Sequence, residues 1–257
     1  MLELRDIEVR FGAITALSGI TFSVKPGEIV ALVGDNGAGK STLLSIMSGA
    51  RRPSGGSIIF GGETVEFSNP RAAARHGIQM VYQDLALIPA ADVATNMFLS
   101  REILRRGPLG LLGWLDKKTM RREAGRQLDT LGVTTLSSVQ NPVEMLSGGQ
   151  RQSVALARAA LALADSSGGG VLLLDEPTAA LGYRQSRSVE DFIRRVAGEG
   201  IGVVLVTHDL PLCFEVADRV AVLYHGKLVA ELQARDTHPD EVVGWITGSR
   251  LQSEAKP

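Results

Sequence analysis

The sequence predicts an α/β fold with a mostly parallel sheet, an N-terminal antiparallel β subdomain and an inserted helical subdomain. Four uninterrupted runs rich in valine, isoleucine and leucine begin at Ile29, Val171, Val203 and Val220. Such runs are typical of strands covered on both faces, and helical stretches precede the last three. Between about 71 and 145, arginine, leucine and alanine replace the strand residues. This change in composition predicts the inserted helical part.

The N-terminal elements follow in order. Residues 1–32 read as short alternating strands with turns at 11–13 and 25–28, and a further hairpin is expected near 58–62. After the apolar run at 29–33, a glycine-rich turn at 34–39 leads to a stretch with apolar residues at helical spacing. The order is therefore strand, phosphate-sized loop, helix.

We expect one domain over residues 1–248, with the helical subdomain at about 71–160, and a flexible tail at 249–257. Within the helical part, Met120, Ala124, Leu128 and Leu131 recur at helical spacing. Basic residues surround them at Arg105, Arg106, Lys117, Lys118, Arg121 and Arg122. This basic face could lie near anionic lipid headgroups, but a helix face exposed to solvent is the more usual explanation of such a pattern.

Composition limits the partners. The 257 residues are 44% hydrophobic, and 27 basic residues nearly balance 28 acidic ones, so no net field favours nucleic acid and we expect no such partner. The chain has a single cysteine, Cys213, which cannot form an internal disulfide. A lone cysteine fits a protein of the reducing cytoplasm, and we expect Cys213 to be buried in a helix. The first six residues lack the apolar core of a secretion signal. No run reaches the roughly 18 apolar residues of a membrane span, so any action on a membrane comes from one side.

A phosphate-binding loop is the clearest motif. It consists of Gly34, Asp35, Asn36, Gly37, Ala38, Gly39, Lys40 and Ser41, followed by Thr42. The glycines let successive backbone N–H groups point at phosphate oxygens, and the helix N-terminus adds positive potential. Lys40 would reach the β- and γ-phosphates, and the Ser41 hydroxyl would bind Mg²⁺. The sequence thus predicts a P-loop ATPase core that binds ATP and Mg²⁺.

Two carboxylates follow the apolar run that begins at Val171. Asp175 and Glu176 would lie at the carboxyl edge of the sheet, where ligands of parallel α/β folds bind. Asp175 would hold Mg²⁺ through water, and Glu176 would polarise the attacking water. Without the phosphate loop, a solvated turn would explain the pair as well.

A second anion-binding turn consists of Ser147, Gly148, Gly149 and Gln150, which precede a helical run. One nucleotide has no evident need for two such cradles. At this point the sequence resembles the ATP-binding subunits of ABC transporters, over nearly the whole chain and in the family's motif order. The resemblance implies a homodimer that sandwiches ATP head to tail, so that Ser147 and Gly149 would contact the γ-phosphate held by the partner's loop.

The resemblance also implies roles for three more residues. Phe11 would stack on adenine, Gln83 would touch Mg²⁺ and the water and sense the permease, and His208 would contact the γ-phosphate and orient the base. Taken alone, a phenylalanine before glycine is more often core packing, and a lone glutamine or histidine after a strand is more often an exposed or structural residue.

One position departs from the family pattern. After Glu176, Pro177 and Thr178 the family usually has an aspartate where this chain has Gly182. That aspartate helps to link the two active sites, so coupling or turnover is expected to be weaker here. Because the phosphate loop, Glu176 and His208 are retained, we still expect hydrolysis.

The stretches 82–89 and 96–102, together with Ala-Ala-Leu-Gly at 179–182, resemble the ribose, xylose and fructose branch of bacterial sugar importers. Many members of that branch carry two ATPase units, whereas this chain carries one. The resemblance implies an integral membrane permease and, indirectly, an extracytoplasmic sugar-binding protein. It also implies a peripheral position on the cytoplasmic face of the inner membrane.

The sequence leaves two alternative functions open. The first is a non-transport ATPase of the same superfamily that acts on nucleic acid, which would need a long insertion with heptad repeats. The roughly hundred residues between Ser41 and Ser147 contain no sustained heptads. A ribosome-associated member would be expected to carry two ATPase units. A non-hydrolysing regulatory module is the second alternative, which Gly182 leaves open.

Overall fold

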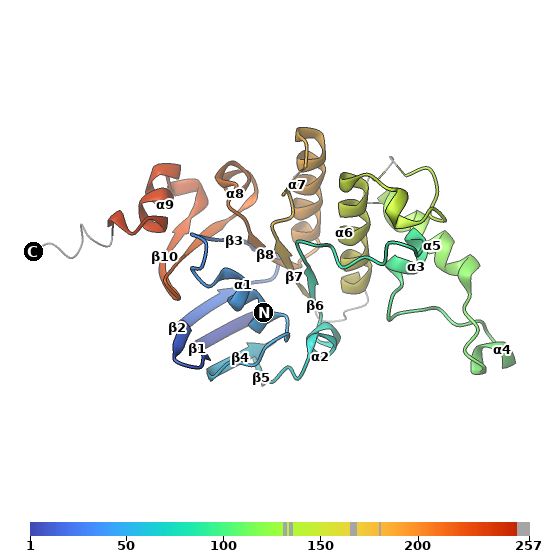
Figure 1. Cartoon of the computed structure of the whole chain (residues 1–257), viewed down its shortest axis with the longest axis horizontal. Coiled ribbons are helices and arrows are strands. Elements are labelled where there is room, and N and C mark those ends of the chain that lie inside the picture. Colours follow the sequence, from blue (N-terminus) through green and yellow to red (C-terminus); the bar gives the residue numbers. More distant parts are fainter. Residues whose placement is uncertain (131–132, 134–135, 165–168, 180, 251–257) are drawn as a thin grey trace, which may run out of the picture.

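The N-terminal part forms a four-stranded antiparallel sheet. The computed structural model describes residues 1–130, 133, 136–164, 169–179 and 181–250 (Figure 1). The strand order is β2-β1-β4-β5, with bounds β1 (Leu2–Phe11), β2 (Ile14–Val24), β4 (Gly55–Phe60) and β5 (Glu63–Val65). All three pairings are antiparallel. The predicted antiparallel β subdomain and the hairpin near 58–62 are confirmed.

The second sheet is mostly parallel, as predicted, and has the order β10-β9-β3-β8-β7-β6. Its strands are β3 (Ile29–Gly34), β6 (Ile78–Val81), β7 (Val171–Asp175), β8 (Gly202–Val206), β9 (Arg219–Tyr224) and β10 (Lys227–Gln233). Only β10 runs antiparallel, against β9. Because β3 lies between β9 and β8, the loop that follows β3 leaves the middle of the sheet at its carboxyl edge.

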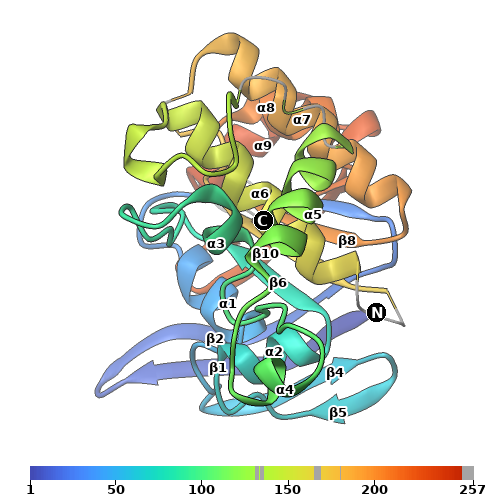
Figure 2. The ribbon, with the colours of Figure 1, turned by 90° about the vertical axis from the view of Figure 1, so that its right-hand side faces the viewer.

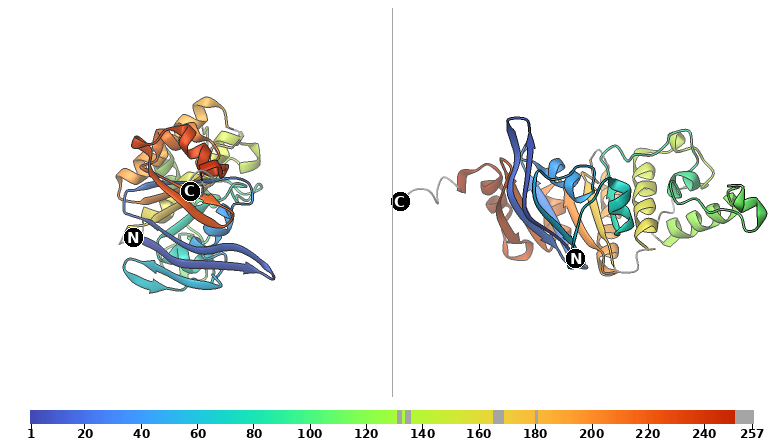
Figure 3. Two further views of the ribbon diagram at one scale, coloured as in Figure 1. Left: turned by 90° about the vertical axis from the view of Figure 1, so that its left-hand side faces the viewer. Right: turned by 90° about the horizontal axis from the view of Figure 1, so that it is seen from below.

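Alternate residues of this sheet face two different layers. Val30 and Leu173 share a core with the N-terminal sheet and α1 (Lys40–Met47). Leu172 and Leu174 face the opposite side, where α6 (Gly148–Ala164), α7 (Tyr183–Gly198) and α8 (Leu210–Val216) pack. On that side α9 (Pro239–Ile246) packs through Val242 and Trp245. Figures 1 and 3 show this layering, with α1 and α6 on opposite faces of one sheet.

The helical part has a core of its own. It contains α3 (Val93–Met97), α5 (Lys117–Thr130) and the N-terminal half of α6, and α4 (Pro108–Leu111) extends from it (Figures 1 and 2). A 3₁₀ turn at Val143–Met145 precedes α6, and a second one, Ala234–Asp236, follows β10. Met120, Ala124 and Leu128 are buried in this core, as the spacing predicted. Leu131 lies outside the described residues.

The segment after residue 71 is not helical throughout. Following α2 (Pro70–Arg75), β6 pairs in parallel with β7, Ile78 opposite Val171, and belongs to the central sheet. The sequence did not predict this strand because β6 has four residues only, and its partner lies far along the chain. The helical subdomain therefore begins after β6. The bounds of the domain and its tail stay predictions, since 251–257 lie outside the described residues.

Within the described part of the chain, no helix is both long and apolar enough to cross a membrane.

Cys213 is buried in α8, as expected, and burial raises the pKa of its thiol to about 12. A thiol is reactive only as the thiolate, so at pH 8 the native chain holds almost none of the reactive form. We expect a disulfide reagent to label the native chain on the order of a thousandfold more slowly than the unfolded chain, measured by absorbance. A Cys213→Ser variant, which has no thiol, gives the background absorbance. Equal labelling rates for the native and the unfolded chain would contradict the burial of Cys213.

Candidate active site

The phosphate loop joins β3 to α1, and the glycines at its two ends leave no room for a side chain. Gly34 has φ 153°, and a Cβ built there would lie 2.3 Å from the carbonyl oxygen of Leu223 in β9. Gly39 has φ 109°, and its Cβ would lie 2.7 Å from Leu17 Cδ2 and 3.1 Å from the backbone oxygen of Ala16. The loop is thus packed closely against β9 at its first glycine and against β2 at its last glycine, where only glycine fits.

Substitution of Gly34 tests this packing. We expect Gly34→Ala to lower the free energy of unfolding by about 3 kcal/mol or more, because the new Cβ would meet rigid backbone. The control is Gly125→Ala, where a Cβ within α5 meets nothing within 4 Å. That change is expected to stabilise the chain by about 0.5–1 kcal/mol. Urea denaturation measures both, and equal stability of the two variants would contradict the packing.

The middle of the loop faces open space. Gly37 has φ 81°, and a Cβ there would meet nothing within 4 Å. Ala38 N donates to Asp35 O at 3.1 Å, and Asn36 N donates to Asp35 Oδ1 at 2.7 Å, which closes the turn. Lys40 Nζ lies over it and donates to Gly34 O at 2.8 Å and Asp35 O at 3.0 Å.

The start of α1 adds donors to the same space. No side chain caps the helix at Gly39, so the first-turn N–H groups, including those of Ser41 and Thr42, are available to a ligand. Backbone donors, a helix N-terminus and an ammonium group together form a cradle for an anion of phosphate size. The residues present therefore fit a phosphate chain.

Two carboxylates lie at the carboxyl end of β7. Asp175 is paired with Val206 of β8, and Glu176 N donates to Val206 O at 2.9 Å. Glu176 adopts φ 49°, a conformation uncommon for a residue with a side chain and often found at functional sites. His208, which follows β8, places its Nδ1 2.8 Å from Glu176 Oε2. The structure thus brings together the two residues that the sequence predicted as base and partner.

Electrostatics place Asp175 close to the phosphate loop. Burial and then the charge of Glu176 raise the pKa of Asp175 above its usual value, while the charge of Lys40 acts in the opposite direction. A neighbouring cation is what such a carboxylate needs to stay ionised. Asp175 also lines a cavity of about 530 Å³ together with Tyr82, Gln83 and Asp84 from the end of β6.

The donor chemistry fits Mg²⁺. Ser41 supplies a hydroxyl, Gln83 an amide oxygen and Asp175 a carboxylate, and oxygen ligands of this kind suit a small hard cation. Among the described residues, no three His, Cys, Asp or Glu side chains cluster as a self-sufficient metal site. Mg²⁺ in nucleotide sites is commonly bound by one or two protein groups and completed by substrate phosphates, so a sparse set is the expected one.

The second anion-binding turn is preorganised at the start of α6. Ser147 N donates to Gln150 Oε1 at 2.9 Å, and Gln150 N donates to Ser147 Oγ at 3.3 Å, which is a reciprocal capping box. Gly149 packs closely, since a Cβ there would lie 2.6 Å from Gln185 Cγ, whereas one on Gly148 would meet open space. Sequence reasoning missed the box, although the Ser-x-x-Gln spacing predicts it.

The two anion-binding motifs do not meet within one chain. α1 packs against β2, β3 and β7 in one layer, and α6 packs against β6, α3, α5 and α7 in the layer on the other side. The described structure therefore keeps Ser147 and Gly149 apart from the chain's own phosphate loop. A single chain offers two separate half-sites.

Phe11 lies at the end of β1 and is 42% exposed, so the core-packing interpretation is wrong. The guanidinium carbon of Arg51 lies 4.3 Å from the centroid of its ring, within the range of a cation–π contact. Sequence reasoning did not identify Arg51, because forty positions separate it from Phe11 and no local pattern connects them. Gly182, the departure from the family pattern, begins α7 without a side-chain cap.

Arg158 is a second residue that sequence reasoning missed. It extends from α6 and donates to Leu85 O and Ala86 O, each at 2.8 Å. Leu85 and Ala86 both have positive φ, at 63° and 44°. Arg158 therefore holds the unusual backbone just after Gln83 in place, and it ties this segment to the helix that begins at the Ser/Gly turn.

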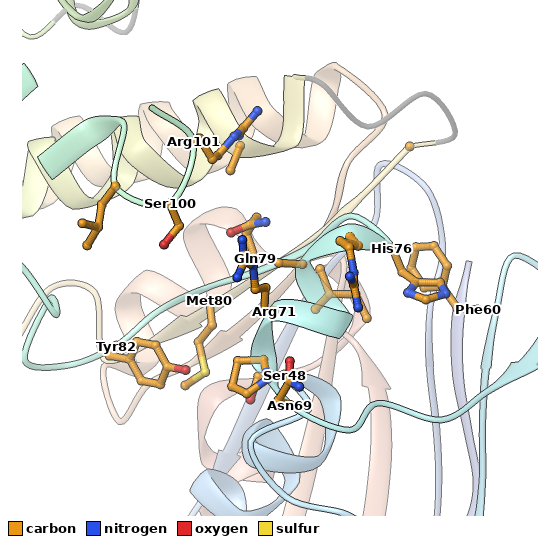
Figure 4. A pocket seen from close by; sticks show the side chains of 17 residues that line it. Ser48, Phe60, Asn69, Arg71, His76, Gln79, Met80, Tyr82, Ser100 and Arg101 are labelled. Carbon is orange, nitrogen blue, oxygen red and sulfur yellow. The ribbon is translucent and has the colours of Figure 1, made fainter. Parts of the chain in front are cut away.

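A larger cavity of about 940 Å³ lies beside this segment (Figure 4). Its walls come from the end of α1, α2, β6, residues 99–101 and α6. The charged side chains around it are basic, namely Arg71, Arg75 and Arg101. Tyr82 borders both this cavity and the smaller one that holds Asp175, so the two are neighbours.

A phosphate loop after a central parallel strand, with a carboxylate pair at the same sheet edge, defines a P-loop ATPase. The family model described as ABC transporter matches residues 17–179. The chain therefore belongs to the ABC transporter family, and it is an ATP-binding ATPase of that family. The confirmed fold class, with an antiparallel sheet beside a mostly parallel one, agrees with this assignment.

Relatives extend over most of the chain. It is 42% identical to the fructose import ATP-binding protein of Rhizobium meliloti, covering 97% of this chain and 95% of the relative. It is 41% identical to the xylose/arabinose import ATP-binding protein of Sulfolobus acidocaldarius, covering 98% and 95%. A ribose import ATP-binding protein of Rubrobacter xylanophilus is 42% identical over 98% of this chain but 46% of its own length, so the chain spans about half of it.

Solved structures give the same fold. A dimeric ATP-binding cassette in a post-hydrolysis state, bound to ADP and phosphate, superposes with a TM-score of 0.75 at 26% identity, covering 91% of this chain and 99% of the other. A nucleotide-free cassette of an ABC transporter superposes with a TM-score of 0.78 at 22% identity, covering 98% and 97%, which supports the fold alone.

Proposed function

We propose that this chain is the ATP-hydrolysing subunit of an ABC transporter that couples ATP binding and hydrolysis to the import of a monosaccharide. The observation that carries the proposal is the likeness to the fructose and xylose/arabinose import relatives, at 42% and 41% identity over nearly the full length of both partners. The single ATPase unit of this chain corresponds to the length of these relatives.

In this proposal the phosphate cradle holds the triphosphate of ATP. The loop from Gly34 to Gly39 supplies backbone donors, and Lys40 leaves its two carbonyl partners to reach the β- and γ-phosphates. Phe11, with Arg51 beside it, offers an aromatic face to adenine. Ser41, Gln83 and Asp175 would hold Mg²⁺, which when bound neutralises charge on the phosphate oxygens.

Glu176 acts on the attacking water. Its Oε2 is engaged by His208 Nδ1, which fixes the orientation of the carboxylate and leaves Oε1 to accept a proton from the water. His208 is 78% exposed, which suits a residue that reaches the γ-phosphate only when a second chain closes over it.

The closing partner is a second copy of this chain. Its Ser147 and Gly149 turn, preorganised by the capping box, would complete the γ-phosphate site. The separation of the two half-sites on opposite layers of one chain supports this homodimer. ATP binding then draws two chains together, and hydrolysis releases them.

The permease is proposed to dock in the 940 Å³ cavity shown in Figure 4. Its basic lining suits a segment of the permease that carries acidic residues. Tyr82 borders the cavity and precedes Gln83, so movement at the docking site would reach the Mg²⁺ ligand directly. The proposal implies a peripheral position at the cytoplasmic face of the inner membrane and a sugar-binding protein on the other side.

Affinity purification from the native cell tests the proposal. We expect the tagged chain to recover a multi-span permease and a sugar-binding protein from gently solubilised membranes. An Arg71→Glu/Arg75→Glu variant is expected to lose the permease, and Arg235→Glu, an exposed charge in a different layer, is expected to keep it. Recovery with nucleic acid or ribosomes, and without a membrane protein, would contradict the transport function and favour the non-transport alternative.

A further inference from the structure

The segment 104–114 concentrates exposed apolar surface. It holds five of the twelve large hydrophobic side chains that are exposed in the described structure, and the other seven are spread over the rest of the chain. The five are Leu104 at 50%, Leu109 at 42%, Leu111 at 91%, Leu112 at 74% and Trp114 at 57% exposure. A cluster of this kind on a soluble surface marks an interaction site. We call residues 104–114 the α4 tip.

Backbone hydrogen bonds hold the α4 tip in a closed turn. Arg105 N donates to Trp114 O at 2.8 Å, Trp114 N donates to Leu109 O at 3.1 Å, and Asp116 N donates to Ile103 O at 2.7 Å. Ile103 and Leu115 at its base pack against the helical core. Figure 1 and the right-hand view of Figure 3 show α4 at the end of the molecule remote from α9. The tip is therefore an ordered projection whose apolar side chains point away from the chain's own core.

Basic residues surround this projection. Residues 101–122 contain seven arginines and lysines and two acids, in a chain whose net charge is -1. Both acids are engaged locally, since Asp116 accepts bonds from Thr119 and Glu102 accepts one from Ser100 N at 3.1 Å. The exposed side chains of Arg105, Arg106, Lys117 and Lys118 lie at its base. Leucine and tryptophan at a tip with cations behind it match the order of acyl chains and anionic headgroups in a bilayer.

A bilayer fits this surface better than a protein does. Specific protein interfaces carry about one hydrogen bond per 100–200 Å². Between Gly107 and Leu115 the only polar side-chain group is the indole N–H of Trp114, which suits the boundary between headgroups and acyl chains. A convex apolar tip needs no matching groove in a fluid lipid phase.

We propose that the α4 tip inserts into the headgroup region of an anionic membrane, with Arg105, Arg106, Lys117 and Lys118 at the lipid phosphates. The inference goes beyond the proposed function, because it gives this chain a lipid contact of its own. The tip begins three residues after Arg101, which lines the proposed docking cavity, so the two proposed contact surfaces are neighbours along the chain. Vesicle binding is measured on the chain alone, without permease or nucleotide. A chain that does not bind vesicles can therefore still prove to be a transporter subunit, and the two hypotheses can fail separately.

Vesicle flotation of the purified full chain tests the inference. We expect the chain to float with equimolar phosphatidylglycerol and phosphatidylcholine vesicles and to stay behind with pure phosphatidylcholine. Arg105→Gln/Arg106→Gln should weaken binding about twenty-fivefold, taking each charge near an anionic surface as worth roughly a factor of five. Leu111→Ser/Leu112→Ser should also lose binding, whereas Ile14→Ser, which is 70% exposed on the β1–β2 hairpin, should bind like the parent chain.

Tryptophan emission locates the contact. Trp114 is exposed and the other tryptophan, Trp245, is buried, so a blue shift on vesicle binding that Trp114→Phe abolishes would assign insertion to the tip. Absence of flotation with anionic vesicles, or equal loss in Ile14→Ser, would overturn the proposal. A Trp114 shift that requires permease in neutral vesicles would also overturn it, because the tip would then contact protein.

Discussion

Replacing Glu176 with glutamine lowers ATP turnover by about 10²–10⁴-fold and leaves ATP binding intact. The amide is nearly isosteric with the carboxylate, so it keeps a contact with His208, whose Nδ1 lies 2.8 Å away in the native chain. It cannot accept a proton from water at neutral pH, and the general-base contribution is lost. Phosphate release and fluorescent-nucleotide binding, measured on the same preparation, separate turnover from affinity.

The matched control is Glu199→Gln, which changes a carboxylate at the C-terminal end of α7, near the start of β8 and so at the edge of the sheet opposite Glu176. It is expected to turn over like the parent chain. Equal turnover of Glu176→Gln and the parent would remove Glu176 from the mechanism. Absence of turnover in every variant and in the parent, even with the permease, would favour the non-hydrolysing module instead.

Replacing Lys40 with alanine weakens ATP binding by about 10–150-fold. The ammonium lies directly over the loop that would hold the phosphates, and a hydrogen bond to a charged group is worth about 1.5–3 kcal/mol. Fold stability should change little, because water can reach the Asp35 carbonyl that Lys40 bonds, and the Gly34 carbonyl is only part-buried. Titration with a fluorescent ATP analogue measures the affinity.

Lys227→Ala serves as the control, since it removes an exposed lysine from β10. Its affinity for ATP is expected to match that of the parent chain. If Lys40→Ala and Lys227→Ala bind ATP equally well, the phosphates do not sit in the loop between Gly34 and Gly39.

Local patterns predicted the parts of the fold that local physics determines. The strands β3, β7, β8 and β9 are continuous apolar runs because they are buried on both faces, and the phosphate loop is recognisable because glycine, lysine and serine each have a fixed task. The short strand β6 was missed, since its burial depends on β7, far along the chain. Its residues carry no strong pattern of their own.

The assembly of the site depends on tertiary contacts in the same way. Nothing local indicates that Arg51 stacks on Phe11, or that Arg158 reaches back to Leu85 and Ala86. The positive φ of Glu176 and its contact with His208 follow from the pairing of β7 with β8. The resemblance implied the roles of Phe11 and His208, and the structure supplied the distances of their contacts.

The proposed mechanism needs two chains that close around ATP, so the decisive measurement is the mass of the assembly. We would measure it by analytical ultracentrifugation of the Glu176→Gln variant, which binds ATP but does not release it by hydrolysis. We expect the mass of one chain without nucleotide and the mass of two chains with ATP and Mg²⁺. A Ser147→Arg change added to Glu176→Gln should keep the protein a single chain with ATP, because the arginine side chain fills the turn that would contact the γ-phosphate of the ATP bound to the partner. A single chain at saturating ATP, with binding verified, would contradict the shared site.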